Sequence, residues 1–138
     1  MANFNKFNSF VADVANKVHN FNSDTFKVAL TAAANAPVAT NGVLTDLTEI
    51  SYTFLSSRTL TTSSSSQTGG LYKWIVTDLV ITASGGTAAT FRYVVIYNDT
   101  AGSKQLVGWY DNVTNVTLQD GQTFTLDSDQ TAGVIQLQ

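Results

Sequence analysis

The sequence contains no cysteine and very little charge. Among 138 residues there are seven Lys or Arg, ten Asp or Glu and one His, so charged residues make up 12% of the chain, about half of the ~25% found in an ordinary soluble domain. Without cysteine, the chain forms neither disulfides nor thiolate metal sites. Its net charge is −3 and its cations are scattered. We therefore expect no nucleic-acid partner, which normally requires a basic patch.

Long apolar runs are also missing. No stretch reaches the ~18 apolar residues of a membrane-spanning helix, and the first ten residues, MANFNKFNSF, lack the apolar centre of a secretory signal. We expect no membrane partner. Hydrophobic residues nevertheless make up 43% of the chain, which is enough for residues 1–138 to form a single domain around one core.

The first segment, residues 1–23, begins with helical periodicity. Its apolar side chains recur every three or four residues, with polar side chains between them: Phe4, Phe7, Phe10, Val11, Val14 and Val18. This spacing predicts a short amphipathic helix over about 4–18, followed by a connecting loop. The apolar stripe packs either on the chain's own sheet, which we favour, or on a neighbouring subunit.

From residue 24 onward the apolar period changes to two, which is typical of strands. The segment 25–31, TFKVALT, predicts a half-buried strand, whereas 90–98, TFRYVVIYN, is apolar on both faces and predicts a central strand covered on both sides. The run 71–84 predicts two shorter strands with a bulge or bend near Asp78. QLVGWYD and GVIQLQ predict two further strands. Residues 44–50 either form one helical turn or are irregular, and 51–55 predict a short strand.

Turn signals separate these segments. Residues 61–70, TTSSSSQTGG, predict a flexible Ser/Gly loop because they offer nothing to a core. VTLQDGQTFTL predicts a hairpin with a type I′ turn at Asp120-Gly121. Eight to ten short strands in total predict a mainly β fold, an antiparallel β-sandwich of jelly-roll type with a short N-terminal amphipathic helix.

The ionisable residues match no catalytic or metal-binding pattern. His19 is the only histidine, and a Ser–His–Asp site would need an acid and a nucleophile beside it; a capping or surface role at the helix end is simpler. Asp127-Ser128-Asp129 has the alternating acids of a calcium loop without the rest of that motif, which favours turn capping. We expect no enzyme activity, no cofactor, and no catalytic, cofactor-binding or metal-binding residues.

Aromatic residues suggest one alternative function. Trp74, Trp109 and Tyr110 would form a sugar-binding platform if the fold exposed them together, which would indicate a carbohydrate-binding module. At strand spacing, however, such residues more often fill a core or an interface.

A set of sequence blocks runs through nearly the whole chain: FNKFNSFVADVANKVHNFNSDTFKVALT, NAPVATN, DLTEI, YKWIVTDLVITASGGT, FRYVVIYNDT, LVGWYD and DGQTF. As a set they resemble a family of small structural proteins of tailed bacteriophages, most closely the capsid decoration, or cement, proteins. The resemblance implies a protein made in the host cytoplasm that binds across junctions of the major capsid protein on the exterior of the virion. It also implies self-association as a dimer or trimer. A tail, baseplate or fibre component is the alternative within this class.

The candidate interface residues come from two segments. Five belong to the predicted helix and two to a predicted strand: Phe4, Phe7, Phe10, Val11, Val14, Trp109 and Tyr110.

Overall fold

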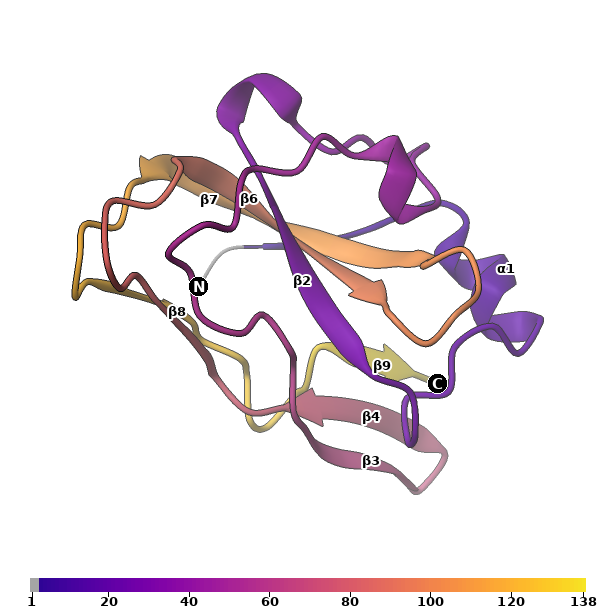
Figure 1. Cartoon of the computed structure of the whole chain (residues 1–138). Helices are drawn as coiled ribbons and strands as arrows, with labels where there is room; N and C mark the ends of the chain where they lie inside the picture. The colour runs from indigo at the N-terminus through magenta and orange to yellow at the C-terminus, as the bar shows by residue number, and fades with distance from the viewer. Residues whose placement is uncertain (1–2) are drawn as a thin grey trace.

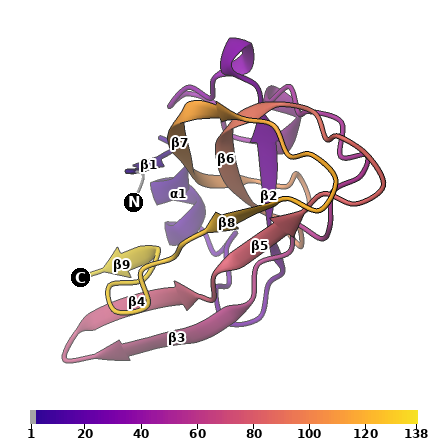
Figure 2. The same cartoon turned by 90° about the vertical axis from the view of Figure 1, so that its left-hand side faces the viewer.

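The computed structural model describes residues 3–138, and these form two layers of antiparallel strands with one short α-helix (Figures 1 and 2). One layer is a four-stranded sheet in the order β1 (Phe4–Lys6), β7 (Leu106–Val116), β6 (Phe91–Asn98) and β2 (Phe26–Thr31). The other is divided into β3 (Thr62–Thr68), β4 (Leu71–Val76) and β9 (Ile135–Leu137), and a pair formed by β5 (Leu79–Thr82) and β8 (Thr123–Leu126). The predicted mainly β, antiparallel sandwich with a short helix is confirmed.

β6 lies inside the four-stranded sheet because both of its faces are apolar. Val94 and Ile96 belong to the main core between the layers, whereas Val95 and Tyr97 belong to a second cluster. The expectation of a central strand covered on both faces is confirmed.

β2 was expected to be half-buried, and this is wrong. Val28 and Leu30 enter the main core, while Ala29 is fully buried in the second cluster. Leu44 and Leu47, from the connection that contains the short helices η1 (Ala33–Asn35) and η2 (Leu44–Asp46), pack against that cluster. The connection therefore covers a face that strand alternation alone would leave to solvent.

The second layer supplies the other half of the core. Trp74 and Val76 of β4, Ile81 of β5 and Ile135 of β9 are all buried. The chain bends between β4 and β5, at Thr77 and Asp78, as expected. This bend divides one long apolar run between the two small sheets.

The Ser-rich run is a strand rather than the expected flexible loop. β3 pairs with β4 through a two-residue turn at Gly69-Gly70, whose φ angles of 60° and 85° match the two positive values of a type I′ turn. Side chains on one face of the strand also find partners: Trp74 Nε1 donates to Thr62 Oγ1 over 2.9 Å, and Ser65 Oγ lies 2.7 Å from the Tyr72 hydroxyl. Pairing with β4 therefore orders β3, although the residues of β3 supply no apolar side chain to the core.

The prediction of a hairpin around Asp120-Gly121 is also wrong, although a turn is present there. Gln122 N donates to Gln119 O over 2.9 Å, and Gly121 has a φ of 86°, the only positive φ at the two central positions, as in a type II turn. The two arms then separate, because β7 ends in the four-stranded sheet and β8 pairs with β5. Residues 51–55 are likewise not a strand: they turn at Phe54, and only Leu55 forms a bridge, with Ala83.

The N-terminal helix is shorter than the expected 4–18. α1 covers only Phe10–Ala15, and Phe4–Lys6 is β1, which pairs with Gly108–Tyr110 of β7. Gly108 permits this approach, since a Cβ there would lie 2.2 Å from the Phe4 ring. The spacing of Phe4, Phe7 and Phe10 imitates a helix because a strand residue, a turn residue and a helix residue all point inward.

Candidate functional site

A shallow and mostly apolar hollow lies between α1 and the β3-β4-β9 sheet, with a volume of about 410 Å³. We call it the α1 hollow; its lining includes Val14, Lys17, His19, Phe21, Tyr72 and Leu137. α1 contributes Val14, the loop after it contributes Lys17 to Phe21, and the sheet contributes the other two. The hollow therefore joins the N-terminal segment to the second layer.

His19 lines this hollow but is only 8% exposed. Its ring lies against the rings of Phe10, Phe21 and Phe26 at centroid distances of 5.6, 5.8 and 6.0 Å. The expected capping or surface role of His19 is therefore wrong, because the ring is buried in an aromatic cluster. The signal for burial was present in the sequence as the neighbouring phenylalanines.

Asn98 determines how His19 bonds. Its Oδ1 accepts from the backbone N–H groups of Thr100 (3.0 Å) and Ala101 (3.1 Å), so its NH₂ group faces Asp24 Oδ2 at 2.7 Å and His19 Nδ1 at 3.1 Å. His19 Nδ1 therefore accepts a hydrogen bond, and the proton of the neutral ring lies on Nε2. Within residues 3–138, Nε2 is buried without a hydrogen-bond partner.

This arrangement has the opposite polarity to a catalytic triad. In a triad, Nδ1–H donates to a carboxylate and Nε2 takes the proton of a nucleophile. Here Nδ1 accepts from an amide. Burial lowers the pKa of His19, which Asp13 and Asp24 partly oppose through their charges. The geometry therefore holds a neutral imidazole that packs and accepts one hydrogen bond.

We expect the stability of the protein to depend on pH through His19. Because its pKa is lowered in the folded state, the unfolded chain binds more protons as the pH falls below the ordinary value of about 6.5, and stability decreases. Urea unfolding at intervals between pH 7.5 and 5 should show this loss, with a slope of at most about 1.4 kcal/mol per pH unit for one proton.

His19→Gln is the control for this prediction, since the chain has no other histidine. Its unfolding free energy should be lower but nearly independent of pH over the same range. A slope that persists unchanged in the variant would show that another group titrates.

A second hollow, of about 450 Å³, opens between the layers where β7 and β8 approach each other. We call it the β7–β8 hollow; its lining includes Val94, Tyr110, Asp111, Asn112, Phe124 and Asp127. Burial raises the pKa of Tyr110 to about 12. Asp111 accepts from Arg92 Nε (2.8 Å) and Nη2 (2.9 Å), and this bidentate bond lowers its pKa.

The structure does not bring the three candidate sugar-binding aromatics together. Trp74 is fully buried in the core beside Phe26, at a centroid distance of 4.7 Å. Trp109 packs on Phe7 at 4.6 Å, in the second cluster. Only Tyr110 lines a hollow, and there it is accompanied by Phe124.

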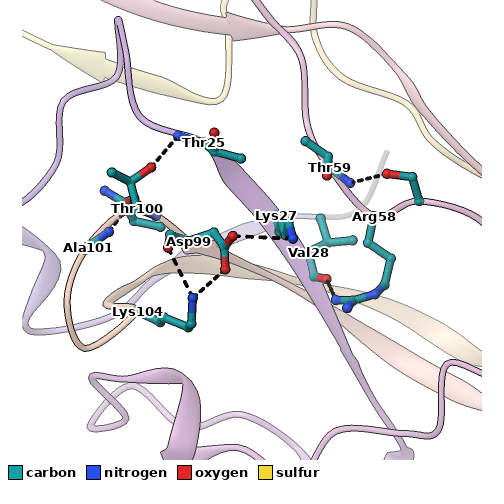
Figure 3. A network of polar contacts seen from close by, with 11 residues as sticks. Thr25, Lys27, Val28, Arg58, Thr59, Asp99, Thr100, Ala101 and Lys104 are labelled. Atoms are coloured by element: carbon teal, nitrogen blue, oxygen red, sulfur yellow. Dashed lines mark hydrogen bonds and ion pairs between the residues drawn. The ribbon is translucent and has the colours of Figure 1, made fainter.

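The largest charged cluster ties loops to the four-stranded sheet (Figure 3). Asp99 lies 2.6 Å from Lys104 Nζ and 3.4 Å from Lys27 Nζ, and the Lys104 hydrogen bond is the main cause of its lowered pKa. Thr25 N donates to Thr100 Oγ1 over 2.9 Å in the same cluster. On the other side of β2, an Arg58 nitrogen donates to Val28 O. These charges hold the ends of strands together.

Other acids cap turns. Asp129 Oδ1 accepts from the N–H groups of Thr131 and Ala132, both at 2.8 Å, and these bonds lower its pKa. The expectation of turn capping at Asp127-Ser128-Asp129 therefore holds for Asp129. Among residues 3–138, no group of three His, Cys, Asp or Glu side chains is close enough to hold a metal ion.

The seven candidate interface residues have different surroundings. Phe7 and Phe10 are buried within the chain, at 0% and 3% exposure, so the apolar stripe packs mainly on the chain's own strands. Phe4 is half-buried against Tyr110, at a centroid distance of 5.2 Å, and Trp109 is partly covered by Phe7. Val11 remains 56% exposed, and Val14 lines the α1 hollow.

No protein-family model, curated protein or solved structure matches this chain. Of the helices in the part that the structure describes, none is long and apolar enough to cross a membrane.

Proposed function

We propose that this chain is a structural protein of a tailed-phage particle, a capsid decoration protein that binds across junctions of the major capsid protein on the head exterior and stabilises the head. One observation carries this proposal beyond the sequence resemblance. Several charged side chains pair with one another, as Asp99 does with Lys27 and Lys104, whereas several apolar side chains remain exposed; the most exposed are Val11, Val38, Val80 and Val113. Such a surface is suited to contact with another protein.

A low-charge exterior lowers the desolvation cost of docking. A decoration protein binds in many copies, so each contact can be weak while the assembled shell gains a large total stabilisation. A rigid sandwich that covers both faces of its main sheet keeps its shape on binding. These properties support a role in which the surface of the protein binds other proteins.

The α1 hollow and the adjacent Val11 form the surface that we assign to the capsid. They combine exposed apolar side chains, Val11 at 56% and Leu137 at 37%, with a concave apolar lining. In a contact of this kind, a capsid side chain would enter the hollow and cover Val14 and Tyr72. This surface contains two of the expected interface residues, Val11 and Val14. It also contains Tyr72 and Leu137 of the second layer, which were not expected.

Quantitative mass spectrometry of purified phage particles tests the proposal. We expect the chain at a copy number close to that of the major capsid protein. A Val11→Asp variant, supplied in place of the wild-type chain, should be depleted from the heads. Absence of the wild-type chain from intact particles would contradict a virion role, and a few copies per particle would favour the tail, baseplate or fibre alternative.

A second candidate, carbohydrate binding, rests on the β7–β8 hollow. Tyr110 and Phe124 give it aromatic surface, and Asn112 and Asp127 give it polar groups that suit sugar hydroxyls. A glycan array probed with the wild-type chain and with Tyr110→Phe would support this role if binding occurred and fell in the variant. No binding at high protein concentration would remove it.

A further inference from the structure

β3 is the longest strand edge that the fold leaves open. It has seven residues, while β1, β8 and β9 have three or four. Two other edge strands are covered: Val28 N donates to Arg58 O over 2.9 Å beside β2, and Ser56 N donates to Thr82 O over 3.0 Å beside β5. Within residues 3–138, no backbone group pairs with the outer edge of β3.

This edge also lacks the usual protection against pairing. Strand edges that must stay single carry Lys, Pro or an inward-pointing charge. β3 reads TSSSSQT, without charge or proline, and its one irregularity, between Thr62 and Ser64, lies at one end. In Figures 1 and 2, β3 is the outermost strand of its sheet, on the side away from the four-stranded sheet. A partner strand would reach it without meeting the rest of the molecule.

The turn identifies which backbone groups face outward. In the two-residue turn at Gly69-Gly70, the flanking residues Thr68 and Leu71 exchange hydrogen bonds, and the bonding direction alternates along the strand. Ser66, like Thr68, therefore bonds to β4. The N–H and C=O groups of Ser65 and Gln67 point outward, and Ser65 is the middle residue of the strand. The alternation ends at the bulge between Thr62 and Ser64, where Ser63 Oγ donates to Ile75 O of β4.

We propose that two copies of this chain pair antiparallel along β3, about a two-fold axis that passes through Ser65. Ser65 then lies opposite its own copy, and Ser64 lies opposite Ser66 of the other copy. Each sheet contributes three strands to one continuous sheet. A second copy fits this edge because the strand is uncharged, so that no like charges oppose each other, and because cross-strand Ser and Thr pairs stabilise antiparallel sheets.

This pairing would give the self-association that the resemblance to decoration proteins implies, and it rests on the proposed function only in that respect. It is tested on the purified chain alone, by sedimentation. Failure to dimerise and absence of the chain from phage heads are therefore separate results.

We expect the wild-type chain to approach twice its mass of 14.8 kDa as its concentration rises. Ser64→Lys with Ser66→Lys places Lys opposite Lys twice and should weaken the dimer at least roughly tenfold. Ser64→Lys with Ser66→Glu places opposite charges across the axis and should restore it. Thr123→Lys with Thr125→Lys, which adds the same charge to exposed positions of β8, should leave the dimer unchanged.

The pairing would be overturned by a wild-type chain that stays monomeric up to about 1 mM, by a double-lysine variant that dimerises like wild type, or by a charge swap that fails to restore dimers. Ser65→Cys gives a test that is independent of charge, because the chain has no cysteine. It should form a disulfide-linked dimer under mild oxidation far more readily than Ser103→Cys, on an exposed loop. Equal cross-linking of the two variants would also overturn the inference.

Discussion

Replacing Phe7 with aspartate is expected to remove a large part of the protein's stability at 25 °C. Phe7 is 0% exposed, and its ring packs on Trp109 beside Val95 and Leu106. The loss of a buried phenylalanine costs about 3–5 kcal/mol, and an unpaired buried carboxylate adds to this. We therefore expect a loss of at least about 4 kcal/mol in urea unfolding, which is a large part of the about 5–15 kcal/mol that stabilises a domain of this size.

Val11→Asp is the matched control, because it introduces the same charge into the same predicted helical stripe. Val11 is 56% exposed, so its replacement should change the unfolding free energy by no more than about 0.5 kcal/mol. Similar large losses in both variants would contradict the packing described for this segment. Similar small losses would mean that Phe7 is not buried.

Replacing Asn98 with leucine has the second largest expected effect. The side chain is fully buried, and its removal leaves the N–H groups of Thr100 and Ala101, together with His19 Nδ1 and Asp24 Oδ2, without one of their partners. Each buried polar group left unpaired costs about 1–3 kcal/mol. We expect a total loss of about 3 kcal/mol in urea unfolding, because some of these groups will bond to water.

Asn115→Leu provides the comparison, since Asn115 is an exposed residue of β7. It should be nearly neutral. In the Asn98→Leu variant, ¹⁵N chemical shifts of the His19 ring should also lose the preference for the Nε2–H form. If Asn98→Leu is as stable as Asn115→Leu, the bonds of Asn98 are not important for the fold.

Much of the fold is predictable from the sequence wherever the local spacing of apolar residues indicates which side chains are buried. The two apolar faces of 91–98 identify the central strand, and the bend near Asp78 separates two strands. The start of the helix is less clear, because Phe4, Phe7 and Phe10 have a helical spacing although only Phe10 lies in α1. Three inward side chains at such intervals do not distinguish a helix from a strand followed by a turn.

The remaining errors have a common physical cause, which is long-range pairing. β3 has no apolar pattern of its own and is ordered by β4 and by the turn between them. The segment 123–126 has the pattern of a hairpin arm, yet its partner is β5, more than 40 residues earlier in the chain. Local sequence signals indicate that a strand exists, and they do not say which strand it joins.

The candidate sites were less predictable than the fold for the same reason. Val14 of α1 meets Tyr72 and Leu137 in the α1 hollow only because the second layer lies beneath the helix. His19 was judged from its place in an Asn-rich segment, and its burial depends on Asn98, which lies 79 residues away. Tyr110 alone of the three aromatic candidates reaches a hollow, because strand alternation and sheet position send Trp74 and Trp109 to two different clusters.

A single-particle reconstruction of the purified virion would show whether this chain decorates the head. We expect icosahedrally arranged density for this sandwich on the outside of the head, over junctions between major capsid subunits, with Val11 and the α1 hollow facing the shell. Heads without such density, or density for this chain only along the tail axis, would contradict this expectation.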